Sequence, residues 1–350
     1  MLNTIKMVAF GVAALAATSV AAEVNLTSNA AGAGTAGALS ATSLVENAAE
    51  RGIANIQLKD GQTGTNYVLA LAEGKIDLAS APFILPFLMA RAAGPYSNMD
   101  SDQAHELGHS IQMLYPYTFS IYTLYAYDAK GVSNWEDIEG MKVLNGPPRG
   151  TAALNSRSLI QLFTDLKSDE DYESVTVNWG QMAQAIIEGS ADVAVIPVMF
   201  PGPRVTQASA AGSMTMISMP REAFEAEAAQ KFLNKPGSTP FLVPLAEIRE
   251  AMGDQWTVTS EDDMFRGMAV PGGDFVNASM DEELAYQLTK SHIENLDNIR
   301  AMAPFMATLN FGDVSEEANG LCGANIVKFH PGAVRAWEEA GYELPECAKP

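Results

Sequence analysis

The chain has 350 residues, with 21 basic against 42 acidic side chains and a formal net charge of −21 at pH 7. A surface this acidic repels nucleic acid and anionic membranes, which excludes proteins that bind either of them. It also repels a free anion at long range. Any anion site must therefore be local, built from main-chain N–H groups, helix ends or a placed arginine.

The first residues have the pattern of an export signal. Lys6 supplies a positive charge, residues 7–17 are apolar, and the small residues 19–22 precede Glu23. We expect residues 1–22 to be a signal peptide that is cleaved after Ala22. The apolar stretch is shorter than the roughly 20 residues of a membrane-spanning helix, and no later segment is long enough to span. The mature chain is therefore predicted to be periplasmic and not membrane-inserted.

The two cysteines, Cys322 and Cys347, lie near the C-terminus. In the oxidising compartment outside the cytoplasm a disulfide between them is the natural interpretation, and two free buried thiols are the alternative. With two cysteines and four histidines, a thiolate metal cluster is excluded.

An internal repeat organises the chain. Residues 73–82 (EGKIDLASAP) and 188–197 (EGSADVAVIP) carry Glu, Gly, Asp, Ala and Pro at the same five places. Each follows an apolar-periodic run and is predicted as a helix ended by glycine, then a short buried strand. Upstream, the pairs Gly34-Thr35 and Gly150-Thr151 follow predicted strands at residues 24–27 and 142–144. The alternative is coincidence in a Gly- and Ala-rich chain.

Each half is thus predicted as strand, Gly/Thr loop, helix, strand, helix, strand, which is the pattern of an α/β sheet. We expect two lobes, each a mixed sheet flanked by helices, with a ligand cleft between them. Lobe 1 is predicted to begin with residues 23–120, lobe 2 to cover 121–230, and residues 231–350 to complete lobe 1 with C-terminal helices. Within that last stretch, residues 281–299 are predicted as one long amphipathic helix. Ser133 and Glu136 have capping-box spacing for a short helix before Gly140.

In open α/β sheets ligands bind beyond the carboxyl ends of strands, here the loops 28–35, 80–83, 145–151 and 197–204. A helix N-terminus after a glycine loop presents unpaired N–H groups and a partial positive charge, and Arg149 adds a planar fork suited to a carboxylate. The candidate ligand residues are Ser28, Asn29, Gly34, Thr35, Asn66, Tyr67, Ser80, Tyr115, Pro148, Arg149, Gly150, Thr151, Trp179, Gln181 and Pro197. The alternatives are tight turns for the glycines, a solvated loop residue for Arg149, core packing for the aromatic residues, and helix caps for Asn66 and Gln181.

Two motifs suggest other chemistries. Gly32, Gly34 and Gly37 match G-x-G-x-x-G after a strand, but no acidic residue is well placed for a ribose, so no cofactor is expected. The segment 105–109 (HELGH) matches H-E-x-x-H, which puts His105 and His109 on one helix face for zinc. The extended zincin pattern would need glycine and histidine where Gln112 and Tyr115 stand. A zinc-dependent hydrolase is the alternative function, and a solvated helix end is the simpler interpretation.

Taken in order, several stretches resemble the TAXI family of substrate-binding subunits of TRAP transporters. They are residues 28–37, 64–80, 114–116, 131–143, 146–151, 179–197 and 329–333. The resemblance implies a two-lobed type II periplasmic binding-protein fold with a hinge, and no enzyme activity. It implies a receptor for a small organic anion, such as glutamate or a dicarboxylate, that delivers its ligand to a TRAP permease driven by an ion gradient.

The sequence departs from the family pattern at both glycine loops. The first loop has Ala38-Leu39 where an aromatic pair is usual, and the second has Pro147-Pro148-Arg149 where small residues are common. Arg149 is therefore expected to shift selectivity towards a more strongly anionic ligand. A periplasmic sensor module, which presents its ligand to a membrane kinase, is a further alternative with the same binding chemistry.

Overall fold

The computed structural model describes residues 24–32, 34–61, 63–148, 151–316 and 318–350. The expected signal peptide and its cleavage site lie outside the described residues, as do Arg149 and Gly150. Within the described residues, no helix combines the length and the apolar character needed to cross a membrane.

The two halves of the repeat have the same topology. In each half the first strand lies between the other two and pairs with both in parallel, so the strand orders are β2-β1-β3 and β6-β5-β7. The first half consists of β1 (Asn25–Asn29), α1 (Ala36–Glu50), β2 (Asn55–Lys59), α2 (Gly64–Ala72) and β3 (Leu78–Pro82). The second consists of β5 (Lys142–Gly146), α5 (Thr151–Thr164), β6 (Glu173–Thr176), α6 (Met182–Ile187) and β7 (Val193–Val198). The predicted α/β fold with two similar halves is confirmed.

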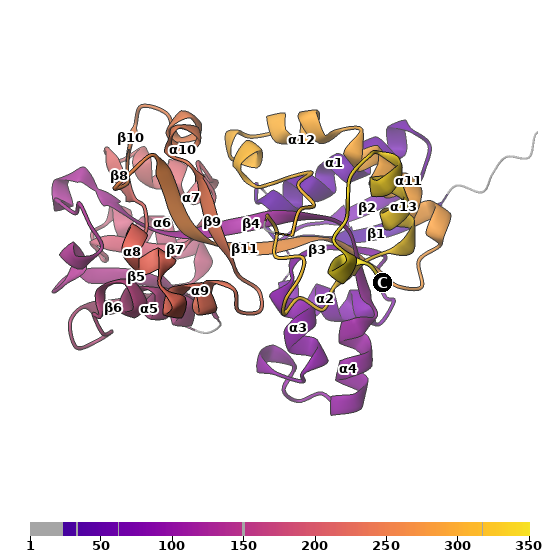
Figure 1. Ribbon diagram of the computed structural model, residues 1–350, viewed down its shortest axis with the longest axis horizontal. Helices are drawn as coiled ribbons and strands as arrows, with labels where there is room; N and C mark the ends of the chain where they lie inside the picture. The colour runs from indigo at the N-terminus through magenta and orange to yellow at the C-terminus, as the bar shows by residue number, and fades with distance from the viewer. Residues whose placement is uncertain (1–23, 33, 62, 149–150, 317) are drawn as a thin grey trace, which may run out of the picture.

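Two long antiparallel strands join the lobes: β4 (Ile111–Tyr127) and β11 (Met264–Asn277) run through the centre of the molecule (Figure 1). β3 extends the sheet on the β11 side and β7 extends it on the β4 side, both antiparallel. The pairing between β4 and β11 shifts by one residue at Phe119. Ser120 pairs with Val270 and Thr118 pairs with the next residue, Pro271, so Phe119 is left out of the pairing. Such a bulge bends a strand, so the two lobes meet at a built-in kink.

Lobe 2 also contains the chain that follows β7. It adds α7 (Pro203–Ser209), β8 (Met214–Ile217), α8 (Arg221–Glu225), α9 (Glu227–Leu233), β9 (Thr239–Pro244), α10 (Leu245–Met252) and β10 (Trp256–Thr259). β10 pairs with β8, and β9 pairs with the first half of β11. We therefore propose that the chain returns to lobe 1 through β11 rather than near residue 231.

Lobe 1 carries α3 (Ile84–Ala90) and α4 (Ser101–His109) before β4, and the C-terminal elements after β11. These are α11 (Glu282–Ile293), α12 (Leu296–Ala301), β12 (Lys328–Phe329) and α13 (Pro331–Glu339). The single helix predicted over 281–299 is wrong, because the chain turns between α11 and α12. At that turn the Asn295 side chain donates a hydrogen bond of 3.1 Å to Ser43 Oγ on α1. The break lets the chain follow the surface of α1.

The capping box predicted at Ser133 and Glu136 is also wrong. Residues Glu136–Ile138 form a single 3₁₀ turn. Its carboxylate partner is Asp137, which accepts 2.8 Å hydrogen bonds from the N–H and the hydroxyl of Ser133. Asn134 Oδ1 in turn accepts from the Asp137 N–H at 3.1 Å.

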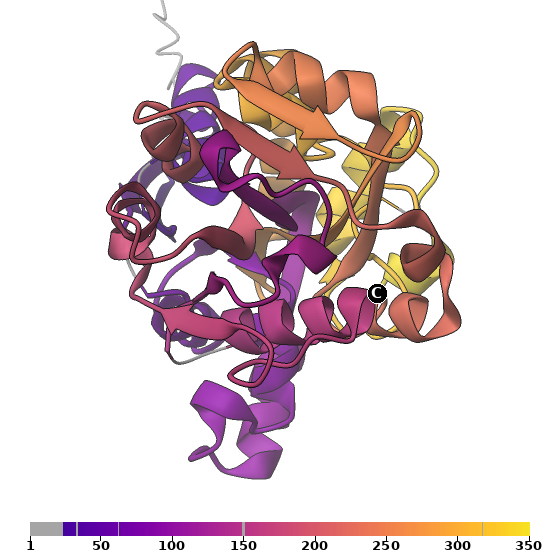
Figure 2. The same cartoon turned by 90° about the vertical axis from the view of Figure 1, so that its left-hand side faces the viewer.

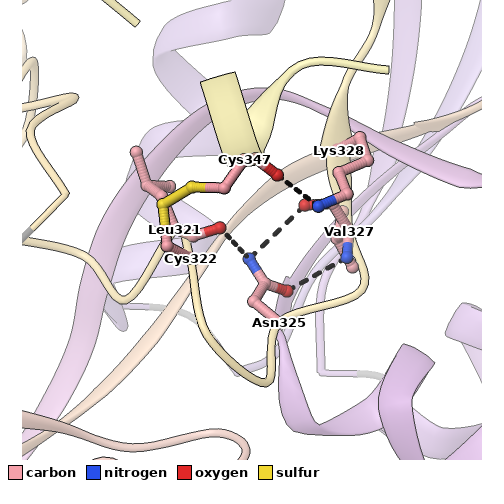
Figure 3. The surroundings of a disulfide bond; sticks show 6 residues. All are labelled: Leu321, Cys322, Asn325, Val327, Lys328 and Cys347. Carbon is pink, nitrogen blue, oxygen red and sulfur yellow. Dashed lines mark hydrogen bonds between the residues drawn. A yellow bond between two sulfur atoms is a disulfide. The ribbon is translucent and has the colours of Figure 1, made fainter. Parts of the chain in front are cut away.

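The predicted disulfide is present and fastens the C-terminal tail to lobe 1 (Figure 3). Cys322 and Cys347 have Cα atoms 5.5 Å apart and are bonded, so the alternative of two free thiols is wrong. Next to the bond, Lys328 Nζ donates to the Cys347 carbonyl oxygen. Asn325 Oδ1 accepts from the Val327 N–H at 3.0 Å. The bond and these contacts hold the loop before β12 against the tail.

Replacing Cys322 and Cys347 together by serine should lower the free energy of unfolding by about 3 kcal/mol. The disulfide closes a loop with a sequence separation of 25, and the expected value follows from the loop-closure entropy that is regained by the unfolded chain. Urea denaturation measures it, and reduction of the wild-type protein should give a similar loss. An unchanged urea midpoint in both experiments would contradict the prediction.

Candidate functional site

The first glycine loop of lobe 1 lies against lobe 2. Gly34 has a φ of +75°, and a β-carbon placed on it would lie 3.5 Å from Cγ of Pro203, the first residue of α7. Thr35 then caps α1: its hydroxyl accepts from the Ala38 N–H at 3.3 Å and donates to the Gly32 carbonyl at 2.8 Å. The N-terminus of α1 is therefore held next to the interlobe contact. Any side chain on residue 34 would also be strained at this φ.

Arg204, the residue after Pro203, carries a partly buried guanidinium that the sequence analysis did not list. Its guanidinium carbon lies 4.7 Å from the centroid of the Trp179 ring, and the Trp179 side chain is 40% exposed. Burial lowers the pKa of the Arg204 guanidinium, and the neighbouring Tyr125 acts in the opposite direction. An arginine stacked on an indole and close to a second lobe is a suitable partner for a carboxylate.

Arg204 differs from the other partly or fully buried arginines of the described chain, because each of the others donates at least one side-chain hydrogen bond. Their acceptors are Ser174 for Arg157, Asp262 for Arg266, the Phe311 carbonyl for Arg300 and Glu283 for Arg335. No hydrogen bond or ion pair joins Arg204 to any described residue. The sequence signal that could have found it is its place two residues after Gly202, in the predicted loop 197–204.

The candidate ligand residues divide by exposure. Gly34, Thr35 and Asn29 are partly buried, whereas Asn66, Pro148, Thr151, Trp179 and Gln181 are exposed. Ser28, Tyr67, Ser80, Tyr115 and Pro197 are buried. The Tyr67 hydroxyl donates to the Ser80 carbonyl oxygen at 2.7 Å, so this side chain already has a partner inside lobe 1. Arg149 and Gly150 lie outside the described residues.

Two asparagines occupy equivalent places at the ends of the first strands of the two halves. Asn29 ends β1, and Asn145 is the penultimate residue of β5. Both have a buried side-chain atom without a hydrogen-bond partner, Oδ1 in Asn29 and Nδ2 in Asn145. Asn145 Oδ1 accepts from Ser174 Oγ at 2.6 Å. The repeat thus places an amide with spare hydrogen-bonding capacity behind each glycine loop.

Asp274, which the sequence analysis also missed, joins one of the candidates, Ser80, to α1 and β4 inside lobe 1. It is fully buried on β11 and accepts hydrogen bonds from Ser40 Oγ on α1 at 2.7 Å, from Tyr117 OH at 3.1 Å and from Ser80 Oγ. Burial raises the pKa of the Asp274 carboxyl, and the hydroxyl donors oppose that shift. The Tyr115 ring, from the same part of β4, stacks on His292 with 3.3 Å between ring centroids. This network ties α1 to the strands that form the hinge.

The H-E-x-x-H segment lies on α4, which projects from the body of the molecule (Figures 1 and 2). His105 and His109 are exposed, with ring centroids 4.2 Å apart, and His109 Nδ1 lies 2.9 Å from the His105 carbonyl oxygen. Among the residues that the structure describes, no group of three or more His, Cys, Asp or Glu side chains is arranged to hold a metal ion. Nothing in this part of the chain supplies the third ligand that a zinc site requires.

A cavity of about 800 Å³ lies between β9 and the segment 310–325. It is lined by Lys235, Phe241 and Leu242 of lobe 2, by Pro271 of β11, and by Asn325, among others; none of the candidate ligand residues lines it. Lys235 Nζ donates to Asn155 Oδ1 at 2.7 Å and lies 3.5 Å from the centroid of the Phe232 ring. The cavity is therefore separate from the predicted anion site.

Replacing Asp274 by alanine should lower the free energy of unfolding by about 3 kcal/mol, because the buried hydroxyls of Ser40, Ser80 and Tyr117 lose their shared acceptor. Urea denaturation followed by circular dichroism measures the loss. Alanine at the exposed Asp254 is the control and should leave the midpoint unchanged. Equal midpoints for both variants would show that the network contributes nothing to stability.

Lys235 should make stability depend on alkaline pH. Burial lowers its pKa from the ordinary 10.5 to about 8 in the folded state. Between these values the unfolded chain binds more protons, so the contribution of Lys235 to stability rises as pH increases from about 8 to 10. Replacing Lys235 by methionine should remove the contribution of Lys235 to the rise in Tm between pH 8 and 10. Replacing the exposed Lys231 by methionine should leave this rise in Tm unchanged. Parallel Tm curves for wild type and the Lys235 variant would refute this.

The chain is similar to several solved structures, and the first of the three described next supports the fold. A protein of Bordetella bronchiseptica RB50 is 12% identical over 91% of this chain and 99% of its own, with a TM-score of 0.50. A TRAP periplasmic solute-binding protein from Rhodobacter sphaeroides, in an open form without ligand, is 14% identical over 91% and 93%, with a TM-score of 0.48. The aliphatic sulphonate-binding protein SsuA from Escherichia coli is 18% identical with a TM-score of 0.39; the match covers 55% of this chain and 58% of that one.

No curated protein matches the sequence. A family model, in contrast, matches residues 34–341, which include the end of the first glycine loop, the whole second glycine loop, both hinge strands and Arg204. The protein belongs to the NMT1-like family.

Proposed function

We propose that this protein is an exported solute receptor whose two lobes close on a small organic anion. The proposal rests on the arrangement of the two βαβαβ halves, which have the same strand order and are joined by β4 and β11. In this arrangement the glycine loop of one lobe lies against the first residue of α7 of the other lobe. A ligand at this contact touches both lobes. Its binding free energy therefore favours the closed arrangement over the open one.

The chemistry of the facing loops favours an anion. The first turn of α1 offers main-chain N–H groups next to the contact, and Arg204 offers a guanidinium without a protein partner among the described residues. We propose that the ligand residues are those expected from the sequence. Among them, Asn29, Gly34, Thr35, Asn66, Thr151, Trp179 and Gln181 are at least partly exposed and need the least rearrangement.

For the biological role we propose delivery of the ligand to a TRAP-type permease, as the resemblance to the TAXI family implies. Only the closed form presents a continuous surface from both lobes, so docking of the permease and ligand binding favour the same state. The protein itself needs no cofactor and performs no reaction in this role. Membership of the NMT1-like family is consistent with a two-lobed receptor of this kind.

A thermal-shift screen of small carboxylates should find at least one that stabilises the purified protein. At a concentration of 100 times its Kd, a ligand that binds only the folded state adds about 2.7 kcal/mol to the free energy of unfolding. Small-angle scattering with that acid should then show a smaller radius of gyration, because the lobes close. A screen in which no carboxylate raises the Tm would overturn the proposed function.

A further inference from the structure

Arg204 is a charged group in a place where the protein supplies no opposite charge. It stacks on Trp179 and lies near the buried Tyr125, yet it donates no hydrogen bond to any described residue. A guanidinium has five N–H donors, and partial burial removes some of the water that would otherwise satisfy them. Leaving such a group unpaired costs free energy, and that cost is recovered only if an anion binds.

Comparison with the other arginines of the described chain shows what is particular to Arg204. Acidic side chains outnumber basic ones by 42 to 21, and five of the nine described arginines form an ion pair with one or more of these carboxylates. Arg335, also partly buried, contacts two of them, Glu282 and Glu283. Around Arg204 no acidic side chain of the described residues lies within ion-pair distance. Arg91, Arg157 and Arg249 also lack an ion pair, but Arg91 and Arg249 are exposed and Arg157 donates a hydrogen bond to Ser174. Arg204 is thus the partly buried arginine of the described chain that has neither an ion pair nor a hydrogen bond, and its donors are available to a carboxylate from outside.

We propose that Arg204 is the residue that binds the carboxylate of the ligand and selects acids against their uncharged analogues. The assignment rests on the proposed receptor function. The guanidinium carbon lies over the Trp179 ring, 4.7 Å from its centroid, and a guanidinium can form two parallel hydrogen bonds with a planar carboxylate through its N–H edge. Pro203 meets Gly34 across the lobes, so the bound carboxylate lies next to the first turn of α1 and closes the contact between them.

This assignment defines the ligand class by a single feature, a free carboxylate group. The corresponding primary amide has nearly the same shape but carries no charge and brings its own N–H donors towards the guanidinium. The amide should therefore bind much more weakly at Arg204. The preference for acid over amide, rather than affinity alone, is the property that Arg204 determines.

The test is calorimetric titration with acetate, lactate, succinate, L-glutamate and benzoate, each beside its primary amide. Wild type should bind at least one acid more than tenfold tighter than its amide. Arg204→Met should weaken that acid about 10- to 100-fold, which corresponds to the loss of charged hydrogen bonds, and should leave the amide nearly unchanged. Arg204→Lys, which keeps the charge but not the fork, should fall between them and serves if the methionine variant does not fold.

The matched control is Arg91→Met. Arg91 also lies over an aromatic ring, 4.5 Å from the centroid of Phe87, and is exposed on lobe 1. Like Arg204→Met, the Arg91→Met variant removes one positive charge and one cation–π contact. It should nevertheless leave the binding of every acid unchanged. Equal weakening of a bound acid by both variants would reduce the effect of Arg204 to net charge and overturn the assignment.

The remaining outcomes separate the two proposals. If Arg204→Met weakens acid and amide alike, Arg204 supports the packing of lobe 2 and does not bind the carboxylate. If the acid binds equally well to wild type and Arg204→Met, the receptor function stands and the Arg204 assignment fails. If wild type binds none of the acids, both the proposed function and this assignment are overturned.

Discussion

The antiparallel ladder between β4 and β11 is the constraint on which the arrangement of this protein depends. Each strand takes part in both lobes, so β3 and β7 are attached on opposite sides of the same pair. That placement relates the two βαβαβ halves by an approximate two-fold axis and sets the glycine loop of lobe 1 against α7 of lobe 2. Close packing at the centre of the sheet leaves no room for a side chain at Gly272, since a β-carbon there would lie 2.4 Å from the Ala81 carbonyl oxygen. Movement of the lobes is then expected at the bulge beside Phe119.

The buried carboxylate of Asp274 and the partly buried guanidinium of Arg204 show two uses of a charge near this hinge. Asp274 is enclosed and has its acceptor capacity filled by hydroxyls from α1, β3 and β4, which makes it part of the rigid framework. Arg204 has donors and no acceptor among the described residues, and it follows Pro203, which meets Gly34 across the lobes. Satisfied polar groups stabilise a fold, whereas an unsatisfied one at an interface identifies where a partner is missing.

The sequence predicted the repeat, the two-lobed α/β fold and the disulfide because each leaves a local pattern: glycine-ended helices, short apolar strands, and two cysteines in an exported chain. The predictions from the sequence failed where contacts between residues far apart in the chain determine the structure. The helix over 281–299 is broken by the contact between Asn295 and Ser43, which is invisible in a periodicity. Asp274 looked like any residue of a strand, because its hydroxyl partners come from positions 40, 80 and 117. Arg204 was passed over for Arg149, since a missing salt bridge cannot be detected without coordinates.

The proposed function, an acidic receptor for an anion, has an electrostatic cost that the architecture must offset. A net charge of −21 lowers the local concentration of anionic ligands, and salt screens this repulsion within about 10 Å at 0.1 M. Attraction therefore has to arise at short range, and the proposal assigns it to main-chain N–H groups of α1 and to the partly buried Arg204 near the interlobe contact. At a contact that is partly free of water, opposite charges attract each other more strongly than they do at an exposed surface. In the proposed function, positive groups without protein partners lie near the place where both lobes meet, and an anion bound there contacts both lobes.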